Sequence, residues 1–191
     1  LDRKGLRNLI LDIDNNTSGT FCSAEALRLI PRVFLRPINV RTLKWEYIDF
    51  EDNLIRIPAE DMKNQNDHLV PLAKQVAVRL SEVKQITGYS QYVFPNQKDS
   101  SSPISKNVLT NRLRALGYDA DVMSAHGFRS TASTILYEKD WDAEEVETQL
   151  AHLMGTATSR AYNRAKYLSK RRKMMQFWAD YLDELKLQED E

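Results

Sequence analysis

The chain has little cysteine and no long apolar run. Cys22 is its single cysteine, which excludes an internal disulfide framework and suits a reducing compartment. A lone cysteine of this kind is usually a small buried apolar residue. No apolar run approaches the roughly 20 residues that a membrane-spanning helix needs, and the N-terminus has no signal-peptide pattern. These absences exclude a disulfide-rich secreted domain and predict a protein that has no membrane partner.

Patterns that hold metals or nucleotides are also missing. The three histidines are scattered along the chain, and neither a His-Glu-x-x-His pattern nor a pair of cysteines is present. There is no P-loop either. We therefore expect no metal and no other cofactor.

What remains is the composition of an ordinary globular protein. With 191 residues, of which 42% are hydrophobic and 28% charged, the chain fits one domain with a real core, or at most two small ones. It contains no internal repeat and no low-complexity tract. The first residue is Leu1 rather than methionine, which suggests an excised fragment.

The net charge is zero, but the charges are unevenly distributed. The segment from Arg160 to Lys173 holds seven basic residues and no acidic one, whereas six acidic residues and one lysine follow Met174. Such a run is often only a solvated helix face. A local positive field can nevertheless attract phosphate whatever the net charge, and here we favour DNA.

Periodicity predicts a mostly α fold with a small antiparallel β-sheet (α+β). Apolar residues at helical spacing predict helices at 3–13, 23–35, 73–86, 105–116, from 125 and from 142. Ser23 is the expected N-cap of the helix at 23–35, and Asp142 that of the helix from 142. Strands are expected at 54–57 and 68–72, with a polar hairpin tip between them.

Three short pieces of sequence carry groups suited to phosphate chemistry. His126 and Arg129 lie three residues apart at the start of a helix, so their side chains point the same way. His152 follows, and ten residues later comes Tyr162, which has an arginine on either side. Arginine binds phosphate oxygens through its planar fork, histidine adds a donor, and tyrosine can act as an oxygen nucleophile.

In these boxes the sequence resembles the tyrosine recombinases, specifically the catalytic domain of phage-type integrases. The matching pieces, in order, are Arg36-Pro37, Met62-Lys63, His126-x-x-Arg129, Leu150-Ala151-His152 and Ala161-Tyr162-Asn163-Arg164. A lone His-x-x-Arg occurs by chance, but five boxes in the right order are a specific signal. The resemblance covers nearly the whole chain and implies one catalytic domain at 1–191, without the N-terminal DNA-binding domains of its parent protein.

The resemblance also implies an activity, which is site-specific DNA recombination (integration or excision) through a 3′-phosphotyrosyl intermediate. The catalytic residues that it implies are Arg36, Lys63, His126, Arg129, His152 and Tyr162. We expect DNA contacts from the basic segment, at Arg160, Arg164, Lys170, Arg171 and Arg172. The family usually has a glutamate three residues after the first arginine. This chain has Asn39 there, so an amide replaces the usual carboxylate support.

Partners and location follow from the same resemblance. We expect double-stranded DNA bearing attachment sites, a homo-tetramer on DNA, and a monomer or swapped dimer without it. The protein would be bacterial or phage-encoded, cytoplasmic and associated with the nucleoid. The apolar stripe formed by Phe177, Trp178, Tyr181, Leu182 and Leu185 should pack on its own domain or on a neighbouring protomer.

Two other functions stay open at this stage. A type IB topoisomerase uses nearly the same residue set, and only the Ala-Tyr-Asn-Arg context favours an integrase. A non-catalytic DNA-binding module would not require the six site residues to converge. Two residues near the site boxes are expected to have structural roles. His68 should pack or cap locally, and Tyr167 should pack at the start of the following helix.

Overall fold

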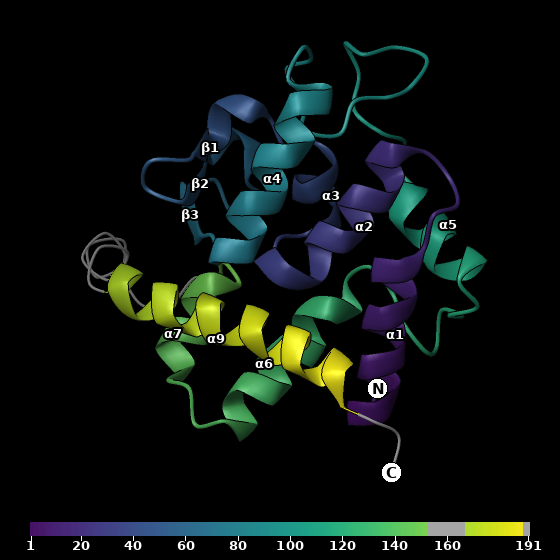
Figure 1. The fold of residues 1–191 in the computed structure, drawn as a ribbon. Helices are drawn as coiled ribbons and strands as arrows, with labels where there is room; N and C mark the ends of the chain where they lie inside the picture. Colours follow the sequence, from purple (N-terminus) through teal and green to yellow (C-terminus); the bar gives the residue numbers. More distant parts are fainter. Residues whose placement is uncertain (153–166, 189–191) are drawn as a thin grey trace.

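The computed structural model describes residues 1–152 and 167–188. Helices make up most of the described chain, and one small antiparallel sheet accompanies them, so the predicted fold class is confirmed (Figure 1). The α-helices are α1 (Arg3–Asn15), α2 (Phe21–Val33), α3 (Pro37–Arg41), α4 (Lys74–Thr87), α5 (Val108–Ala115), α6 (Gly127–Glu138), α7 (Ala143–Gln149) and α9 (Leu168–Leu187). The strands are β1 (Ile48–Asp49), β2 (Leu54–Ile57) and β3 (His68–Pro71), and the short 3-10 helices are η1 (Trp45–Tyr47) and η2 (Ala59–Asp61).

The sheet consists of the β2–β3 hairpin and one further short strand, β1. Its order is β1-β2-β3, and both pairs are antiparallel. Ile55 lies opposite Val70 and Ile57 opposite His68, so the apolar side chains of β2 and β3 face the core together. The connection between β2 and β3 contains η2 and the polar tip, as the sequence predicts.

Helix α2 lies at the centre of the fold and contacts α1, α3, α4, α5, α6 and α9. Its N-cap is Thr20, whose Oγ1 accepts the backbone N–H of Ser23 at 3.3 Å. The prediction that Ser23 caps this helix was therefore wrong by about one turn. The Ser23 hydroxyl instead donates to the carbonyl of Thr20 at 2.8 Å. The helix ends at Phe34, whose backbone is left-handed (φ 60°).

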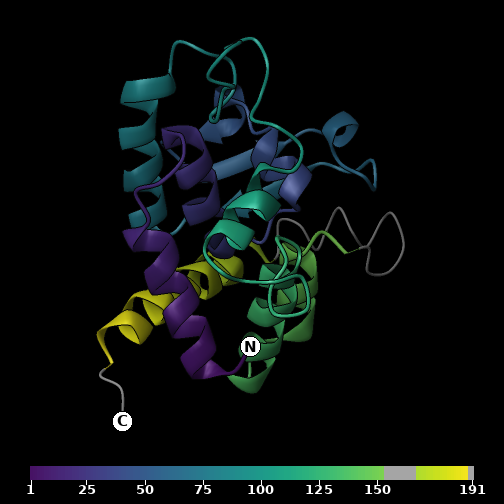
Figure 2. The same ribbon diagram turned by 90° about the vertical axis from the view of Figure 1, so that its right-hand side faces the viewer.

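Two hydrophobic clusters form the core, and they meet where α2 ends. The first joins α2, the sheet, α4 and α5, and the second joins α1, α6, α7 and α9. Phe34 belongs to the second cluster, whereas Leu35, the next residue, belongs to the first. Figure 2 shows the consequence, with the sheet and α4 in the upper part of the molecule and α6, α7 and α9 in the lower part. Arg36 directly follows this junction.

Helix α4 lies where the sequence predicts a helix, at 73–86, and it buries one side. It buries Val76, Leu80 and Val83, which recur at one-turn spacing on one side. Val78, another apolar residue of this helix, is 60% exposed because it lies on the opposite side.

Helix α9 packs on its own domain. Trp178, Leu182 and Leu185 are almost fully buried against the second cluster, and α9 contacts α1, α2, α4, α7 and β3. Figure 1 shows α9 crossing the molecule from α7 to α1. None of the described helices is long and apolar enough to cross a membrane.

Replacing Trp178 with alanine tests how far the fold depends on α9. The ring is 1% exposed, its Nε1–H donates to the carbonyl of Pro31 at 2.8 Å, and it meets Phe34 edge-on at 5.7 Å. We expect Trp178→Ala to lower the free energy of unfolding by about 3–5 kcal/mol in urea titrations. Leu187→Ala, at a position on the same helix that is 83% exposed, should change it by less than about 0.5 kcal/mol. Equal effects of the two substitutions would show that α9 does not support the core.

Candidate active site

Arg129 holds three helices together at one point. It lies in the first turn of α6 and is 4% exposed. Its Nη1 donates to the carbonyl of Phe34, the C-cap of α2, and its Nη2 donates at 2.6 Å to the carbonyl of Leu150, the C-cap of α7. Helix C-termini carry a partial negative charge, so a guanidinium between two of them is well placed. Arginine has five N–H groups, and these two bonds use only part of that capacity.

Arg36 lies beside this junction as the N-cap of α3. Pro37 fixes the first position of the helix. The Arg36 side chain is half-buried, and its buried Nη1 has no hydrogen-bond partner among the described residues. Burial and the charge of Arg36 lower the pKa of Arg129 to about 10. The two guanidinium groups are therefore close enough to repel each other, and an anion between them would reverse that repulsion.

His126 completes one side of the cluster. It is the N-cap residue of α6 and lies at the surface. Partial burial and the positive charges of Arg129, Arg36 and His152 lower its pKa. The imidazole of His126 is therefore favoured in its neutral form, which can accept a proton.

His152 is placed by the turn that ends α7. Leu150 is the C-cap of that helix, and Ala151 has a left-handed backbone (φ 56°). The N–H of Ala151 donates to Thr148 at 3.1 Å and the N–H of His152 to Glu147 at 3.0 Å, the two bonds of a Schellman motif. This turn brings the exposed His152 imidazole back alongside α7, where Nδ1 lies 2.5 Å from Oε2 of Glu147.

The β2–β3 hairpin is fastened to the same turn. Lys63 is exposed near the hairpin tip, and Nδ2 of its neighbour Asn64 donates to the carbonyl of Ala151 at 2.9 Å. Asn39 supports the hairpin from behind, because its buried Nδ2 donates to the carbonyl of Asp61 at 3.0 Å. The amide at Asn39 thus holds η2, the turn that leads to Lys63.

His68 lies under the cluster, at the start of β3. It is 5% exposed, one ring nitrogen bonds to the backbone of Gln149, and Nε2 has no partner within the described parts of the chain. Burial, together with the charges of Arg171, Arg129 and Arg36, lowers its pKa well below 6.5. His68 packs locally, as predicted. Because its ring remains neutral beside three cations, it also adds no positive charge to the cluster.

Arg171 corrects one prediction, that of a DNA contact. It is 1% exposed, and Nη2 and Nε donate to Oε1 of Gln149 at 2.7 and 3.0 Å. Nη2 also donates to the carbonyl of Leu69. Burial lowers its pKa to about 10. Arg171 thus joins α9 to α7 and β3 from inside, because the inward face of α9 includes this position.

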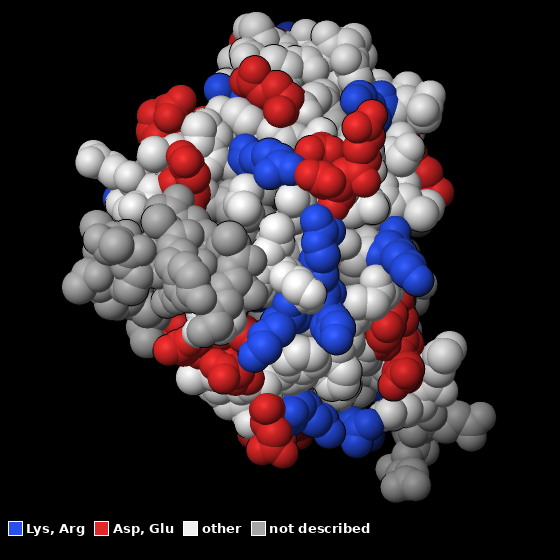
Figure 3. All heavy atoms as spheres, turned by 90° about the vertical axis from the view of Figure 1, so that its left-hand side faces the viewer, with Lys and Arg blue, Asp and Glu red and all other residues white. Residues whose placement is uncertain are grey.

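The other basic residues that were expected to contact DNA differ in their exposure and in their partners. Lys170 is exposed and pairs with Glu145 at 3.0 Å, and Arg172 donates to the carbonyl of Asp52 at 2.7 Å. Figure 3 shows one face on which basic side chains gather at the centre, with clusters of acidic side chains around them. Arg160, Tyr162 and Arg164 lie outside the described residues. Tyr167 is buried before α9, as predicted, and its hydroxyl donates to Glu144.

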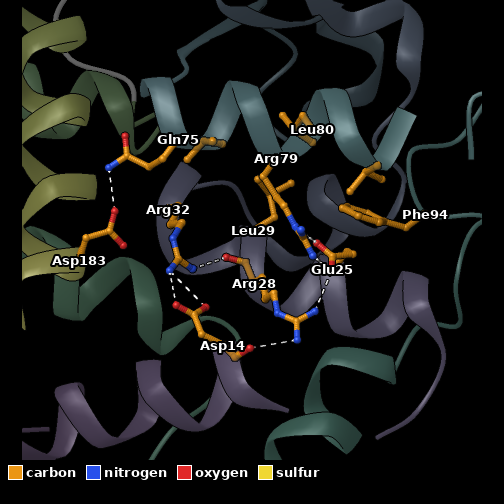
Figure 4. A pocket seen from close by; sticks show the side chains of 12 residues that line it. Asp14, Glu25, Arg28, Leu29, Arg32, Gln75, Arg79, Leu80, Phe94 and Asp183 are labelled. Carbon is orange, nitrogen blue, oxygen red and sulfur yellow. Dashed lines mark hydrogen bonds and ion pairs between the residues drawn. The ribbon is translucent and has the colours of Figure 1, made fainter. Parts of the chain in front are cut away.

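A separate cavity of about 350 Å³ lies between α2 and α4 (Figure 4). Its charged groups pair with one another: Glu25 accepts from Arg28 and Arg79, and Asp14 from Arg32. It shares no lining residue with the cluster around Arg129. We therefore interpret the charged residues that line the cavity as an ion-pair network that joins α1, α2 and α4. The described residues contain no group of His, Cys, Asp and Glu that could hold a metal ion.

Comparison with known proteins identifies the family. The model of the phage integrase family matches residues 4–168. The chain belongs to the phage integrase family. It is 40% identical over 168 residues to the integrase of Shigella phage Sf6, and 40% identical over 168 residues to the prophage integrase IntS of Escherichia coli. Each match covers 87% of this chain and 43% of the relative, so the chain spans less than half the length of these integrases.

Solved structures share the fold of this integrase-family chain. A XerA recombinase superposes with a TM-score of 0.65 at 17% identity, covering 90% of this chain and 64% of that one. The integrase of the Tn1549 transposon, solved in complex with transposon right end DNA, gives a TM-score of 0.54 at 12% identity. That match covers 85% of this chain and 63% of the other. At these identities the likeness concerns the fold alone.

The buried position of His68 makes stability depend on pH. Its pKa in the folded chain lies below the ordinary value of 6.5, so the unfolded chain binds more protons as the pH falls. His68 therefore contributes stability that is present above about pH 6.5 and is lost below it. We expect His68→Asn, which can keep the bond to Gln149, to reduce this loss by up to about 1.4 kcal/mol per pH unit. Urea unfolding at about pH 7.5 and about pH 5.5 measures it. An unchanged pH dependence in the variant would contradict the assignment.

Proposed function

We propose that this chain is the catalytic domain of a site-specific DNA recombinase, and that it cleaves and rejoins DNA through Tyr162. The observation that carries the proposal is the cluster formed by Arg36, His126, Arg129 and His152, drawn from three separate parts of the chain. Family membership supports the same chemistry. DNA, with which the Tn1549 integrase was solved, is the substrate that this cluster of cations suits.

The proposed step is a transesterification in which a tyrosine replaces a DNA oxygen. The phenolic oxygen of Tyr162 attacks the scissile phosphorus, and the bond from phosphorus to the 5′-oxygen breaks. The phenol loses its proton and the leaving 5′-oxygen gains one. The products are a 3′-phosphotyrosyl bond and a free 5′-hydroxyl. The 5′-hydroxyl of another strand reverses the step, so the phosphoester bond is conserved and no ATP is consumed.

The two arginines stabilise the negative charge that builds up on the non-bridging oxygens of the phosphate. Donors fixed before reaction and aimed at the developing charge are usually the largest single contribution to such catalysis. Arg129 is fixed by its bonds to Phe34 and Leu150, so it need not reorganise when the phosphate arrives. Arg36 supplies a second guanidinium, whose buried Nη1 has no hydrogen-bond partner among the described residues.

The remaining groups move protons or orient the phosphate. His126, whose pKa is lowered, suits acceptance of the Tyr162 proton or orientation of the phosphate. Lys63 protonates the leaving 5′-oxygen, a general acid role that contributes roughly 10²–10⁴ in rate. The bond from Asn64 to Ala151 holds the hairpin of Lys63 next to the turn of His152, which supports a shared phosphate for these two side chains. His152 donates to a non-bridging oxygen.

Assembly is part of the proposal. Exchange between two DNA sites requires several copies of the enzyme to act together, and we propose a homo-tetramer on double-stranded DNA. Lys170 and Arg172, which lie toward the surface, and Arg160 and Arg164 remain candidates for phosphate contacts. Arg171 does not, because it is buried.

Covalent capture tests the nucleophile. The chain is incubated with a pool of nicked duplexes of randomised sequence. Because of the nick, the short strand released by cleavage dissociates and cannot be rejoined, so the adduct accumulates. Wild-type protein should form a covalent protein–DNA adduct on denaturing gels, Tyr162→Phe should form none, and Tyr167→Phe should retain it. Phenylalanine cannot form the ester, whereas the Tyr167 hydroxyl already bonds to Glu144. An adduct formed by Tyr162→Phe but not by Tyr167→Phe would overturn the assignment.

A further inference from the structure

Glu147 is an acidic residue inside a basic cluster. It lies in the last turns of α7, five residues before His152, and its side chain is 25% exposed. Both carboxylate oxygens are occupied. Oε2 lies 2.5 Å from Nδ1 of His152, and Oε1 accepts the hydroxyl of Tyr137 at 2.5 Å.

The protonation of this group of three follows from the geometry. Burial raises the pKa of Glu147, but hydrogen bonds from Tyr137 and His152 and the charges of His152 and Arg129 outweigh it, and the pKa lies below its usual range. Glu147 is therefore ionised and can only accept. The proton between Oε2 and the ring must then belong to Nδ1 of His152.

We infer that Glu147 is the positioning residue of His152: through Nδ1 it fixes the tautomer and the plane of the imidazole, so that Nε2 faces the phosphate. This inference rests on the proposed function for its phosphate, but the geometry of the pair does not. When the ring carries both protons, Nδ1–H donates to Glu147 and Nε2–H donates to a phosphate oxygen. Tyr137 holds the other oxygen of the carboxylate and so restricts its rotation.

The backbone supports the same arrangement. The Schellman motif closes on Glu147 itself, because its carbonyl accepts the N–H of His152. Main chain and side chain of Glu147 therefore both bind His152: one bond anchors the backbone of His152 and the other anchors its ring. A freely rotating exposed histidine would lose rotamer entropy on meeting a phosphate, and this double anchor removes that cost in advance.

The first test reads the imidazole directly and needs no activity. Long-range ¹H–¹⁵N spectra of the His152 ring, recorded as the pH is raised until the ¹⁵N shifts stop changing, should show the Nδ1–H tautomer in the wild-type chain. Glu147→Gln should keep it, because the amide oxygen can accept the same proton. Glu147→Ala should shift the ring toward Nε2–H, the tautomer that a free imidazole favours. Glu138→Gln, the same chemical change on an exposed residue of α6, should alter nothing. An Nε2–H tautomer in the wild type, or an unchanged ring in Glu147→Ala, would overturn the inference.

The second test asks whether Glu147 acts through His152. Glu147→Ala should slow adduct formation about 10- to 100-fold, as for other groups that orient a functional histidine, and should leave DNA binding unchanged. In a His152→Ala background the same substitution should have no further effect. A full additional loss in that background would mean that Glu147 merely supports the fold, and the inference would fall.

The two tests separate this inference from the proposed function. If the tautomer behaves as expected and the wild-type chain forms no adduct on any duplex, the proposed function fails and the positioning of His152 stands. If adduct forms but the tautomer does not depend on Glu147, the proposed function stands and the positioning role fails.

Discussion

The site depends on one buried guanidinium bonded to the ends of two helices. Arg129 donates to the last carbonyls of α2 and α7 from the first turn of α6. A buried charge is tolerated only when its donors are used, and here backbone carbonyls at helix C-termini supply the partners. The positions of Arg36 and of the His152 turn then follow. Arg36 comes two residues after Phe34, and His152 two residues after Leu150.

The electrostatics of the cluster explain how a chain of zero net charge can bind an anion. Arg36, Arg129 and Arg171 all act on the buried His68, and Arg36 and Arg129 act on His126. The pKa of each of these two imidazoles is lowered, so the neutral form of each ring is favoured. The arginines stay charged. Glu147 is the acidic side chain that we place within this group, and its two hydrogen bonds direct it toward His152 and Tyr137 rather than toward the phosphate. The local field therefore remains positive.

The sequence predicted correctly the elements that depend on residues close together in the chain. The apolar spacing of Leu6, Leu9 and Ile13 predicted α1, and the strand-forming segments at 54–57 and 68–72 predicted the hairpin. Prediction failed where a residue's role depends on its partner. Nothing in a basic run distinguishes Arg171 from its neighbours until α9 is placed against Gln149. Asn39 stands in the position of a family carboxylate, yet its bond reaches 22 residues along the chain to the turn before Lys63.

Glu147 was missed for a related reason. Its five-residue spacing to His152 does not match helical neighbours at three or four. The contact exists because Ala151 adopts a left-handed backbone and folds the chain back on itself. Glycine is the usual residue at such a turn, and alanine gives no warning of it. A sequence rule that reads only helical periodicity will overlook acidic partners placed in this way.

The most direct test of the central claim is a crystal structure of the Tyr162→Phe chain bound to its DNA. If the cluster is a phosphate site, one backbone phosphate will lie with its non-bridging oxygens within about 3.2 Å of the guanidinium groups of both Arg36 and Arg129. The bonds from Arg129 to Phe34 and Leu150 will remain in place. A complex in which Arg36 and Arg129 contact different phosphates, or none, would contradict the claim that they serve one reaction centre.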